Sequence, residues 1–243
     1  MINVADETEY ILQTRKLSKH FGGVKAITDV DFKLLNGELR CLIGPNGAGK
    51  STFFKMLSAQ HAPTSGEIFF KGQNTTKADA FKVSRLGIGI KNQVPDVFDG
   101  LDVKENIWLA ARFGNSAAMA SHIVDEMISR LSLESISHKL VGELAHGERQ
   151  WVEFGMVSAL GPQLLLLDEP TAGMTVDETA KTAELILELN KTISVIVVEH
   201  DMQFIREIAN IVTVFHQGKI LMEDTMENIQ QNALVRDIYL GKS

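Results

Sequence analysis

The sequence lacks the usual features of secreted, membrane-spanning and nucleic-acid-binding proteins. Its single cysteine, Cys41, excludes an intramolecular disulfide and a cysteine-built zinc site, and suits a reducing compartment. No stretch approaches the roughly 18–20 consecutive apolar residues that a spanning helix needs. Residues 1–7 are acidic and lack the basic region of a signal peptide, so we expect none. The net charge of −7 argues against binding a nucleic-acid backbone.

What is present is typical of an ordinary globular protein. Of the 243 residues, 44% are hydrophobic and 23% are charged, which excludes disorder. Apolar runs at residues 40–43, 164–167 and 193–198 read as buried strands and alternate with helical patterns such as residues 50–59. This alternation, without internal repeats, predicts an α/β fold with a mostly parallel sheet.

Two regions depart from this alternation. Residues 11–40 and 66–72 contain short alternating segments broken by glycines, which predicts antiparallel strands, whereas residues 101–160 read as almost purely helical. We therefore expect a sheet core that carries an inserted helical lobe. Core packing is the expected role of the lobe's large side chains Trp108, Met119, Met127 and Trp151.

A phosphate-binding loop is the clearest chemical motif. Residues 44–51 read GPNGAGKS, match G-x4-G-K-[ST], and lie between a predicted strand and a predicted helix. Glycines let successive N–H groups face one anion, and the helix start adds positive charge. Lys50 would reach the outer phosphates, and the Ser51 hydroxyl would bind Mg²⁺. The loop comprises Gly44, Pro45, Asn46, Gly47, Ala48, Gly49 and Lys50.

Two carboxylates follow a second apolar strand, where the sequence reads LLLLDEP. Asp168 would hold Mg²⁺ opposite Ser51, and Glu169 would polarise the attacking water. Alone, such a pair would be read as a helix cap, but the phosphate loop favours the metal and water roles. A GTPase is disfavoured, because Ile193 replaces the aspartate of a guanine-reading N-K-x-D motif.

With these motifs, residues 144–150, LAHGERQ, resemble the signature L-S-G-G-Q of ATP-binding subunits of ABC transporters. The resemblance extends over residues 17–241. It implies a P-loop NTPase fold with a RecA-like, mostly parallel core, an antiparallel β subdomain and an inserted helical subdomain. It divides the chain into core residues 1–93, helical residues 94–160 with the signature, and core residues 161–243.

The resemblance also implies roles for single residues, with ATP and Mg²⁺ as cofactors. Gln93 matches the loop residue that joins the core to the helical lobe and touches Mg²⁺ and water. His200 matches the switch histidine on the γ-phosphate, Phe21 the aromatic that stacks on adenine, and Thr52 a further phosphate contact. The residues expected to act in catalysis are thus Lys50, Gln93, Glu169 and His200. The expected metal ligands are Ser51, Gln93 and Asp168. The residues expected to bind an opposite nucleotide are Ala145, His146 and Gly147.

The subclass follows from resemblance as well. A histidine in the signature, FGG near the start, EHDM at 199–202 and YLG at 239–241 look like importers of branched-chain amino acids and urea. Residues 146–156, HGERQWVEFGM, are closer to the urea branch. The implied function is ATP hydrolysis that energises import of urea or a short amide, with a branched-chain amino acid importer as the alternative.

The implied partners are a second ATP-binding subunit, transmembrane permease subunits and, indirectly, a solute-binding protein, with no nucleic acid. A heterodimer is expected, on the cytoplasmic face of the cell membrane, with residues 93–106 as the coupling element. Two positions depart from the family: Ala145 replaces the signature serine, and Thr175 stands where aspartate is frequent. These departures leave open an ATP-binding regulatory module with little turnover, although Glu169 and His200 argue against it. An ABC protein acting on DNA or ribosomes is disfavoured by the acidic charge.

Overall fold

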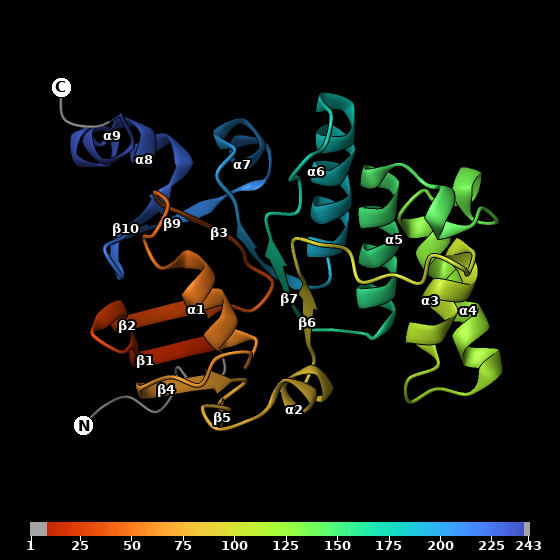
Figure 1. The fold of residues 1–243 in the computed structure, drawn as a ribbon, viewed down its shortest axis with the longest axis horizontal. Helices are drawn as coiled ribbons and strands as arrows, with labels where there is room; N and C mark the ends of the chain where they lie inside the picture. The colour runs from red at the N-terminus through yellow and green to blue at the C-terminus, as the bar shows by residue number, and fades with distance from the viewer. Residues whose placement is uncertain (1–8, 241–243) are drawn as a thin grey trace.

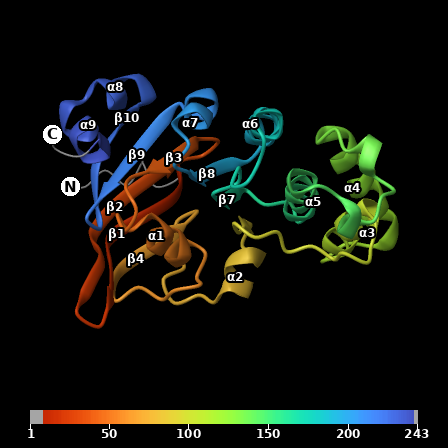
Figure 2. The ribbon, with the colours of Figure 1, turned by 45° about the horizontal axis from the view of Figure 1, so that its top comes forward.

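The structure is a computed structural model that describes residues 9–240 (Figure 1). The expected absence of a signal peptide concerns residues 1–7, which lie outside the described residues, as does Gly241 of the YLG motif. Two sheets form the body of the molecule, and a helical lobe projects from one end of it in both ribbon views (Figures 1 and 2). The predicted combination of a parallel core, an antiparallel β subdomain and a helical lobe is confirmed.

The smaller sheet is antiparallel, as residues 11–40 and 66–72 predicted. It has the order β2-β1-β4-β5 and contains β1 (Tyr10–Phe21), β2 (Val24–Leu35), β4 (Ser65–Phe70) and β5 (Gln73–Asn74). Strands β1 and β2 meet at a tight turn, where Phe21 pairs with Val24 and Gly22 takes the left-handed φ of 57°. Residues 39–40 belong instead to the larger sheet.

The larger sheet has the order β10-β9-β3-β8-β7-β6 and is parallel except for the edge strand β10. It comprises β3 (Leu39–Ile43), β6 (Ile88–Lys91), β7 (Leu164–Asp168), β8 (Ser194–Val198), β9 (Ile211–His216) and the antiparallel β10 (Lys219–Thr225). Strands β3 and β8 are buried along their whole length, which explains why residues 41–43 and 195–198 are apolar without alternation. The three predicted buried strands are confirmed.

Helices cover both faces of this sheet, which separates the hydrophobic core into two clusters. Helix α1 (Lys50–Leu57) packs between the sheets with Phe53 and Phe54 in one cluster, while Cys41 and Phe204 belong to the cluster on the other face. Helix α1 ends two residues before its expected end because Ala59 has a left-handed φ of 56°. The remaining core helices are α2 (Ala80–Arg85), α6 (Val176–Asn190), α7 (Met202–Ile208), α8 (Met226–Gln231) and α9 (Ala233–Leu240).

The lobe is helical, as residues 101–160 predicted. It contains α3 (Val103–Ala111), α4 (Ala117–Arg130), α5 (His146–Ala159) and the 3-10 turns η2 (Glu134–Ile136) and η3 (Val141–Glu143). Met127 and Trp151 are buried and Trp108 is partly buried, but Met119 is 52% exposed, so its predicted core position is wrong. Met119 lies beside the buried stripe of α4, which runs through Ala120, Val124, Met127 and Ile128. None of the helices between residues 9 and 240 is long and apolar enough to span a bilayer.

Candidate functional site

The phosphate loop is pressed between the two sheets at the carboxyl end of β3. Gly44 has a φ of 151°, and a Cβ there would overlap the carbonyl oxygen of Phe215 in β9. Gly49 has a φ of 106°, and its Cβ would lie 2.7 Å from the Ala26 carbonyl oxygen in β2. Both positions require glycine, because side chains rarely adopt these angles and neither site has room for one. The backbone path of the loop is thus fixed by packing.

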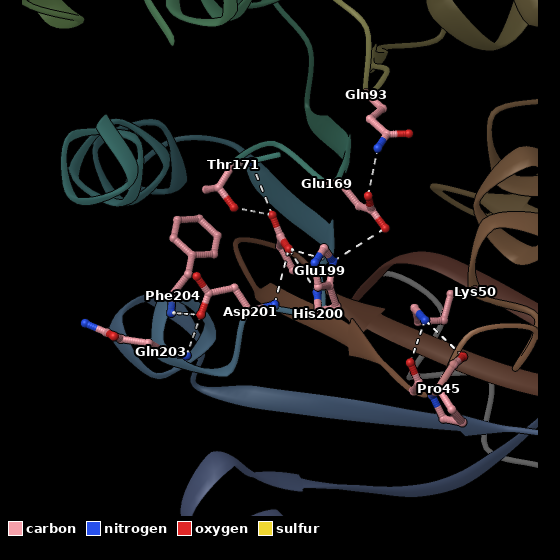
Figure 3. Close-up of polar contacts among 11 residues, drawn as sticks. Pro45, Lys50, Gln93, Glu169, Thr171, Glu199, His200, Asp201, Gln203 and Phe204 are labelled. Carbon is pink, nitrogen blue, oxygen red and sulfur yellow. Dashed lines mark hydrogen bonds and ion pairs between the residues drawn. The ribbon is translucent and has the colours of Figure 1, made fainter. Parts of the chain in front are cut away.

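Lys50 places a cation inside this loop. Its Nζ donates to the carbonyl oxygens of Gly44 at 2.6 Å and Pro45 at 3.3 Å (Figure 3). Burial lowers the Lys50 pKa, whereas the nearby carboxylates of Glu169 and Asp168 oppose that shift. The ammonium is therefore poorly solvated and held next to the loop backbone, where an anion would be attracted to it.

The first turn of α1 continues the anion site. Its N-cap is Gly49; within the described chain no side chain caps this end, and the first turn contains no acidic residue. The early N–H groups of a helix have no intrahelical partner and bind anions well. Ser51 in this turn is exposed and Thr52 is half-buried, so both hydroxyl groups lie at the same end of the helix. The arrangement suits a phosphate chain.

The two predicted carboxylates lie at the end of β7. Asp168 is half-buried, and its pKa is raised by burial and by the charge of Glu169, against the lowering influence of Lys55 and Lys50. Glu169 has a left-handed φ of 46°, a conformation that costs a non-glycine residue energy. Its N–H donates to the Val198 carbonyl oxygen in β8 at 2.9 Å. The left-handed backbone at Glu169 thus directs the carboxylates of Asp168 and Glu169 to different places.

Three predicted catalytic residues meet around Glu169. Gln93 Nε2 donates to Glu169 Oε2 at 2.9 Å, and His200 Nδ1 lies 3.6 Å from Glu169 Oε1. Figure 3 shows the Glu169 side chain between the other two. The residues follow β6, β7 and β8, so parallel strands deliver them to one edge of the sheet. A carboxylate held by an amide and facing an imidazole can orient a water and receive its proton.

The sequence predicted no structural role for Glu199, although it is the best-connected carboxylate in the site. It is 1% exposed and accepts hydrogen bonds from the Thr171 N–H at 3.2 Å, the Thr171 hydroxyl at 2.5 Å and the His200 N–H at 2.9 Å. The bonds join the backbone of His200 to the loop that follows Glu169 (Figure 3). A charged residue directly after a fully apolar strand was the available signal.

The signature residues lie elsewhere. Helix α5, which begins at His146, lies on the other side of β7 from α1 in both ribbon views (Figures 1 and 2). His146 Nε2 lies 3.1 Å from the Ala172 carbonyl oxygen. A Cβ on Gly147 would overlap the carboxylate of Glu178, which therefore covers the start of α5.

Two further predicted positions have local partners. The Phe21 ring is 45% exposed, packs edge-on against His61 at 5.5 Å between centroids, and has Lys19 Nζ 5.0 Å from its centroid. An exposed aromatic face is compatible with base stacking, which stays a prediction. Thr175 is the N-cap of α6 and forms a capping box with Glu178, which gives it a local structural role.

The donor set of the site suits Mg²⁺. Ser51, Asp168 and Gln93 offer a hydroxyl, a carboxylate and an amide oxygen, the hard ligands that Mg²⁺ prefers. A cation would also offset the burial and the neighbouring charge that raise the Asp168 pKa. Over residues 9–240, no group of three or more His, Cys, Asp or Glu side chains could hold a metal.

Comparisons with known proteins agree with this geometry. A family model described as "ABC transporter" matches residues 27–172. The chain is 34% identical over 242 residues to the L-arabinose transport ATP-binding protein of Geobacillus stearothermophilus and 32% identical over 235 residues to a ribose import ATP-binding protein of Rhizobium meliloti. In each case 94% of this chain matches 46% of the relative, so the chain spans about half the length of these relatives.

A solved structure is similar over nearly its full length. It is an ATP-binding cassette of an ABC transporter in its ADP conformation, with a TM-score of 0.85 and 25% sequence identity. The match covers 96% of this chain and 99% of that one. The two-sheet body and the helical lobe are thus present in both proteins.

Proposed function

The chain belongs to the ABC transporter family as an ABC-type ATPase, and we propose that it hydrolyses ATP to energise the import of a small solute. The contact of Glu169 with both Gln93 and His200, beside the phosphate loop, is the observation that carries this proposal. The proposed division into core residues 1–93 and 161–243 and helical residues 94–160 accompanies it.

Each residue has a role that its surroundings support. Phe21 stacks on adenine, the loop from Gly44 to Lys50 and the hydroxyl of Thr52 bind the phosphates, and Ser51, Asp168 and Gln93 hold Mg²⁺. When bound, that ion neutralises charge on the phosphates. Glu169 accepts the proton of the attacking water, and His200 stabilises the transferring phosphoryl group. Catalysis depends on positioning and electrostatics, so it requires a site from which bulk water is excluded.

The proposed partners complete that site. Ala145 and His146 are exposed at the start of α5, a helix on the other side of β7 from α1, which supports contact with the nucleotide of a second ATP-binding subunit. Together the subunits would act on transmembrane permeases, which receive solute from a binding protein. The chain would then lie on the cytoplasmic face of the membrane, with residues 93–106 contacting the permease.

We favour urea or a short amide as the solute, because residues 146–156 resemble the urea branch of importers more closely, whereas residues 199–202 resemble importers of both urea and branched-chain amino acids. Branched-chain amino acids are the alternative within that resemblance. The names of the two relatives suggest pentoses as a third class, but those proteins are about twice the length of this chain. An ATPase subunit does not contact the solute, so its own site cannot discriminate among the three.

ATP hydrolysis by the chain, alone and assembled in lipid with its permeases and second cassette, tests the proposal. We expect turnover to require the assembly and to rise when urea is supplied with the binding protein, but not with leucine, arabinose or ribose. Stimulation by one of these other solutes would overturn the urea assignment and leave the ATPase role intact. Tight ATP binding without turnover in any assembly would support a regulatory module, which the missing hydroxyl at Ala145 favours.

A further inference from the structure

A buried lysine lies immediately before the loop that carries Gln93. Lys91 is the last residue of β6 and is 0% exposed. Its Nζ donates to Gln150 Oε1 in α5 and to the Asn92 carbonyl oxygen at 3.3 Å, and lies 3.3 Å from Glu153 Oε2. A buried charge is unfavourable unless it is paired, so this group needs its partners in α5. The hydrolytic site described above makes no use of it.

The ammonium group fixes the orientation of the Gln150 amide. An ammonium only donates hydrogen bonds, so the Gln150 atom facing it must be the carbonyl oxygen. The amide nitrogen of Gln150 is thereby directed to the Gln93 carbonyl oxygen, 3.2 Å away. Gln150 is itself fully buried, which leaves water unable to replace either bond.

A second bond holds the same loop further along. Glu153, one turn after Gln150 in α5, keeps one carboxylate oxygen near Lys91 and accepts from the Asp96 N–H with the other, at 3.2 Å. Backbone groups on both sides of residues 94–95 are therefore tied to one helix face. The side chain of Gln93 is left directed at Glu169.

We propose that Lys91 is a positioning residue: through Gln150 and Glu153 it locks the Gln93 loop onto α5, so that Gln93 keeps Glu169 oriented and motion of the helical lobe reaches the hydrolytic site. This inference rests on the proposed ATPase function. It assigns the coupling to a buried ionic cluster formed by Lys91, Gln150 and Glu153, rather than to the loop itself.

The cluster also constrains His146. Gln150 Nε2 lies 3.3 Å from His146 Nε2, which is also 3.1 Å from the Ala172 carbonyl oxygen. One ring nitrogen cannot accept from Gln150 and donate to Ala172 at the same time. Because Lys91 holds the amide with its N–H groups toward His146, the histidine must exchange one partner for the other. The hydrogen bond from Gln150 to His146 thereby links the start of the signature to the Gln93 loop. It can form only when His146 Nε2 does not donate to the Ala172 carbonyl oxygen.

Two variants of the full chain test the proposal without leaving a lone buried charge. Gln150→Met keeps the Lys91–Glu153 pair but removes the amide that binds Gln93. The double variant Lys91→Met/Glu153→Met removes both charges together, an exchange that buried pairs often tolerate. Lys181→Met is the matched control, because Lys181 contacts the Trp151 ring of the same helix, 4.1 Å from Nζ to the centroid, and not the loop.

The readouts are hydrogen exchange of residues 91–98, affinity for trinitrophenyl-ATP, and kcat and KM for Mg-ATP in the assembled transporter. We expect both variants to raise exchange of this segment and to lower kcat about fivefold, the effect of losing one hydrogen bond, with KM and nucleotide affinity changed less than about twofold. The control should match the unmodified chain in all of them.

Exchange and kcat equal to those of the control would overturn the proposal, as would equal losses of kcat and nucleotide affinity, which indicate general destabilisation. Failure of the ATPase proposal has a different signature, because the unmodified assembly would then not hydrolyse ATP. In that event, increased exchange at residues 91–98 in both variants would still support the buried lock, and unchanged exchange would refute it.

Discussion

Two helices, α1 and α5, begin at loops with predicted functional residues, and the two helix starts differ in the side chains that cover them. Helix α1 has Gly49 as its N-cap; no side chain of the described residues caps it, and its first turn contains no acidic residue. Helix α5 has Ala145 as its N-cap, the Ala145 N–H donates to Glu148 Oε2 at 3.0 Å, and the carboxylate of Glu178 lies against Gly147. One start is open to an anion, and the other already has acidic partners from its own chain.

The difference teaches where each half of the site must be assembled. Both helix starts attract negative charge for the same physical reason. The α1 start needs only a nucleotide, because glycine geometry and the buried Lys50 already shape it. In the proposed pair of subunits, the α5 start would exchange its own carboxylate contact for a phosphate, which requires local rearrangement. The proposed hydrolytic site would thus be largely formed within one chain, whereas the proposed signature contact would not.

The largest expected effect comes from Glu169→Gln on the preformed side. We expect kcat to fall about 10²–10⁴-fold, because the amide cannot accept the water's proton. Nucleotide affinity should stay within about threefold, since Glu169 contacts Gln93 and His200 rather than the loop. Single-turnover phosphate release with a parallel binding titration measures both. Retention of more than a tenth of the original rate would exclude Glu169 as the base.

Gly44→Ala should weaken nucleotide binding at the open start of α1. The new Cβ would overlap the Phe215 carbonyl oxygen at a φ of 151°, so the loop must shift. Strain of this kind costs about 1–3 kcal/mol, and we expect at least a tenfold loss of nucleotide affinity. Gly37→Ala is the control, since Gly37 also has a positive φ of 78° but a Cβ there would have no atom of residues 9–240 within 4 Å. Equal affinities in the two variants would show that the loop path is not set by β9.

Ala145→Ser should strengthen ATP-dependent pairing at the covered start of α5. Ala145 has the extended angles of an N-cap residue, a position where serine is worth about 0.5–2 kcal/mol over alanine. A hydroxyl bonded to a partner's phosphate adds roughly 1.5–3 kcal/mol, so ATP-dependent pairing should tighten more than tenfold. Sedimentation across an ATP titration measures it, with the exposed Ala118→Ser in α4 as control. Unchanged pairing would mean that α5 does not meet the opposite nucleotide.

The sequence was informative where one local pattern determines one feature. Strands β3 and β8 are buried on both faces, so their runs of apolar residues could be read directly. The glycine spacing of residues 44–49 likewise predicted the phosphate loop, because those backbone angles exclude other residues. Met119 was misassigned because a helix can carry an apolar residue beside its buried stripe without burying it.

Contacts between distant segments could not be predicted in this way. Lys91 and Gln150 are 59 residues apart, and Thr171 and Glu199 are 28 apart. Each of these four polar residues lies within or beside an apolar segment. This pattern indicates that the polar side chain is buried, but it does not identify the residue that it contacts. The partner depends on how β6 and α5 pack and on the order of strands in the sheet. The carboxylate of Glu178 at the α5 start belongs to the same class, because its sequence motif reads only as a helix cap.

The smallest effect concerns Glu178→Gln, which uncovers α5. Hydrogen bonds from Thr175 and Gly147 hold the Glu178 pKa below its ordinary value of 4.5, so the carboxylate is ionised at neutral pH. A depressed carboxyl pKa contributes stability that is present above the ordinary value and is lost as pH falls through the lowered one. Glu178→Gln should therefore be less stable at neutral pH, with a flatter loss of stability on acidification in urea unfolding.

The same substitution should make ATP-dependent pairing tighter by about twofold to fivefold, because a neutral amide competes less with phosphate for the positive helix end. Glu184→Gln removes the same charge from an exposed position of α6 and is the control. Weaker pairing in Glu178→Gln than in this control would mean that the carboxylate organises the α5 start for the partner instead of covering it. In that case both helix starts, the open one of α1 and the covered one of α5, would already be arranged to bind phosphate.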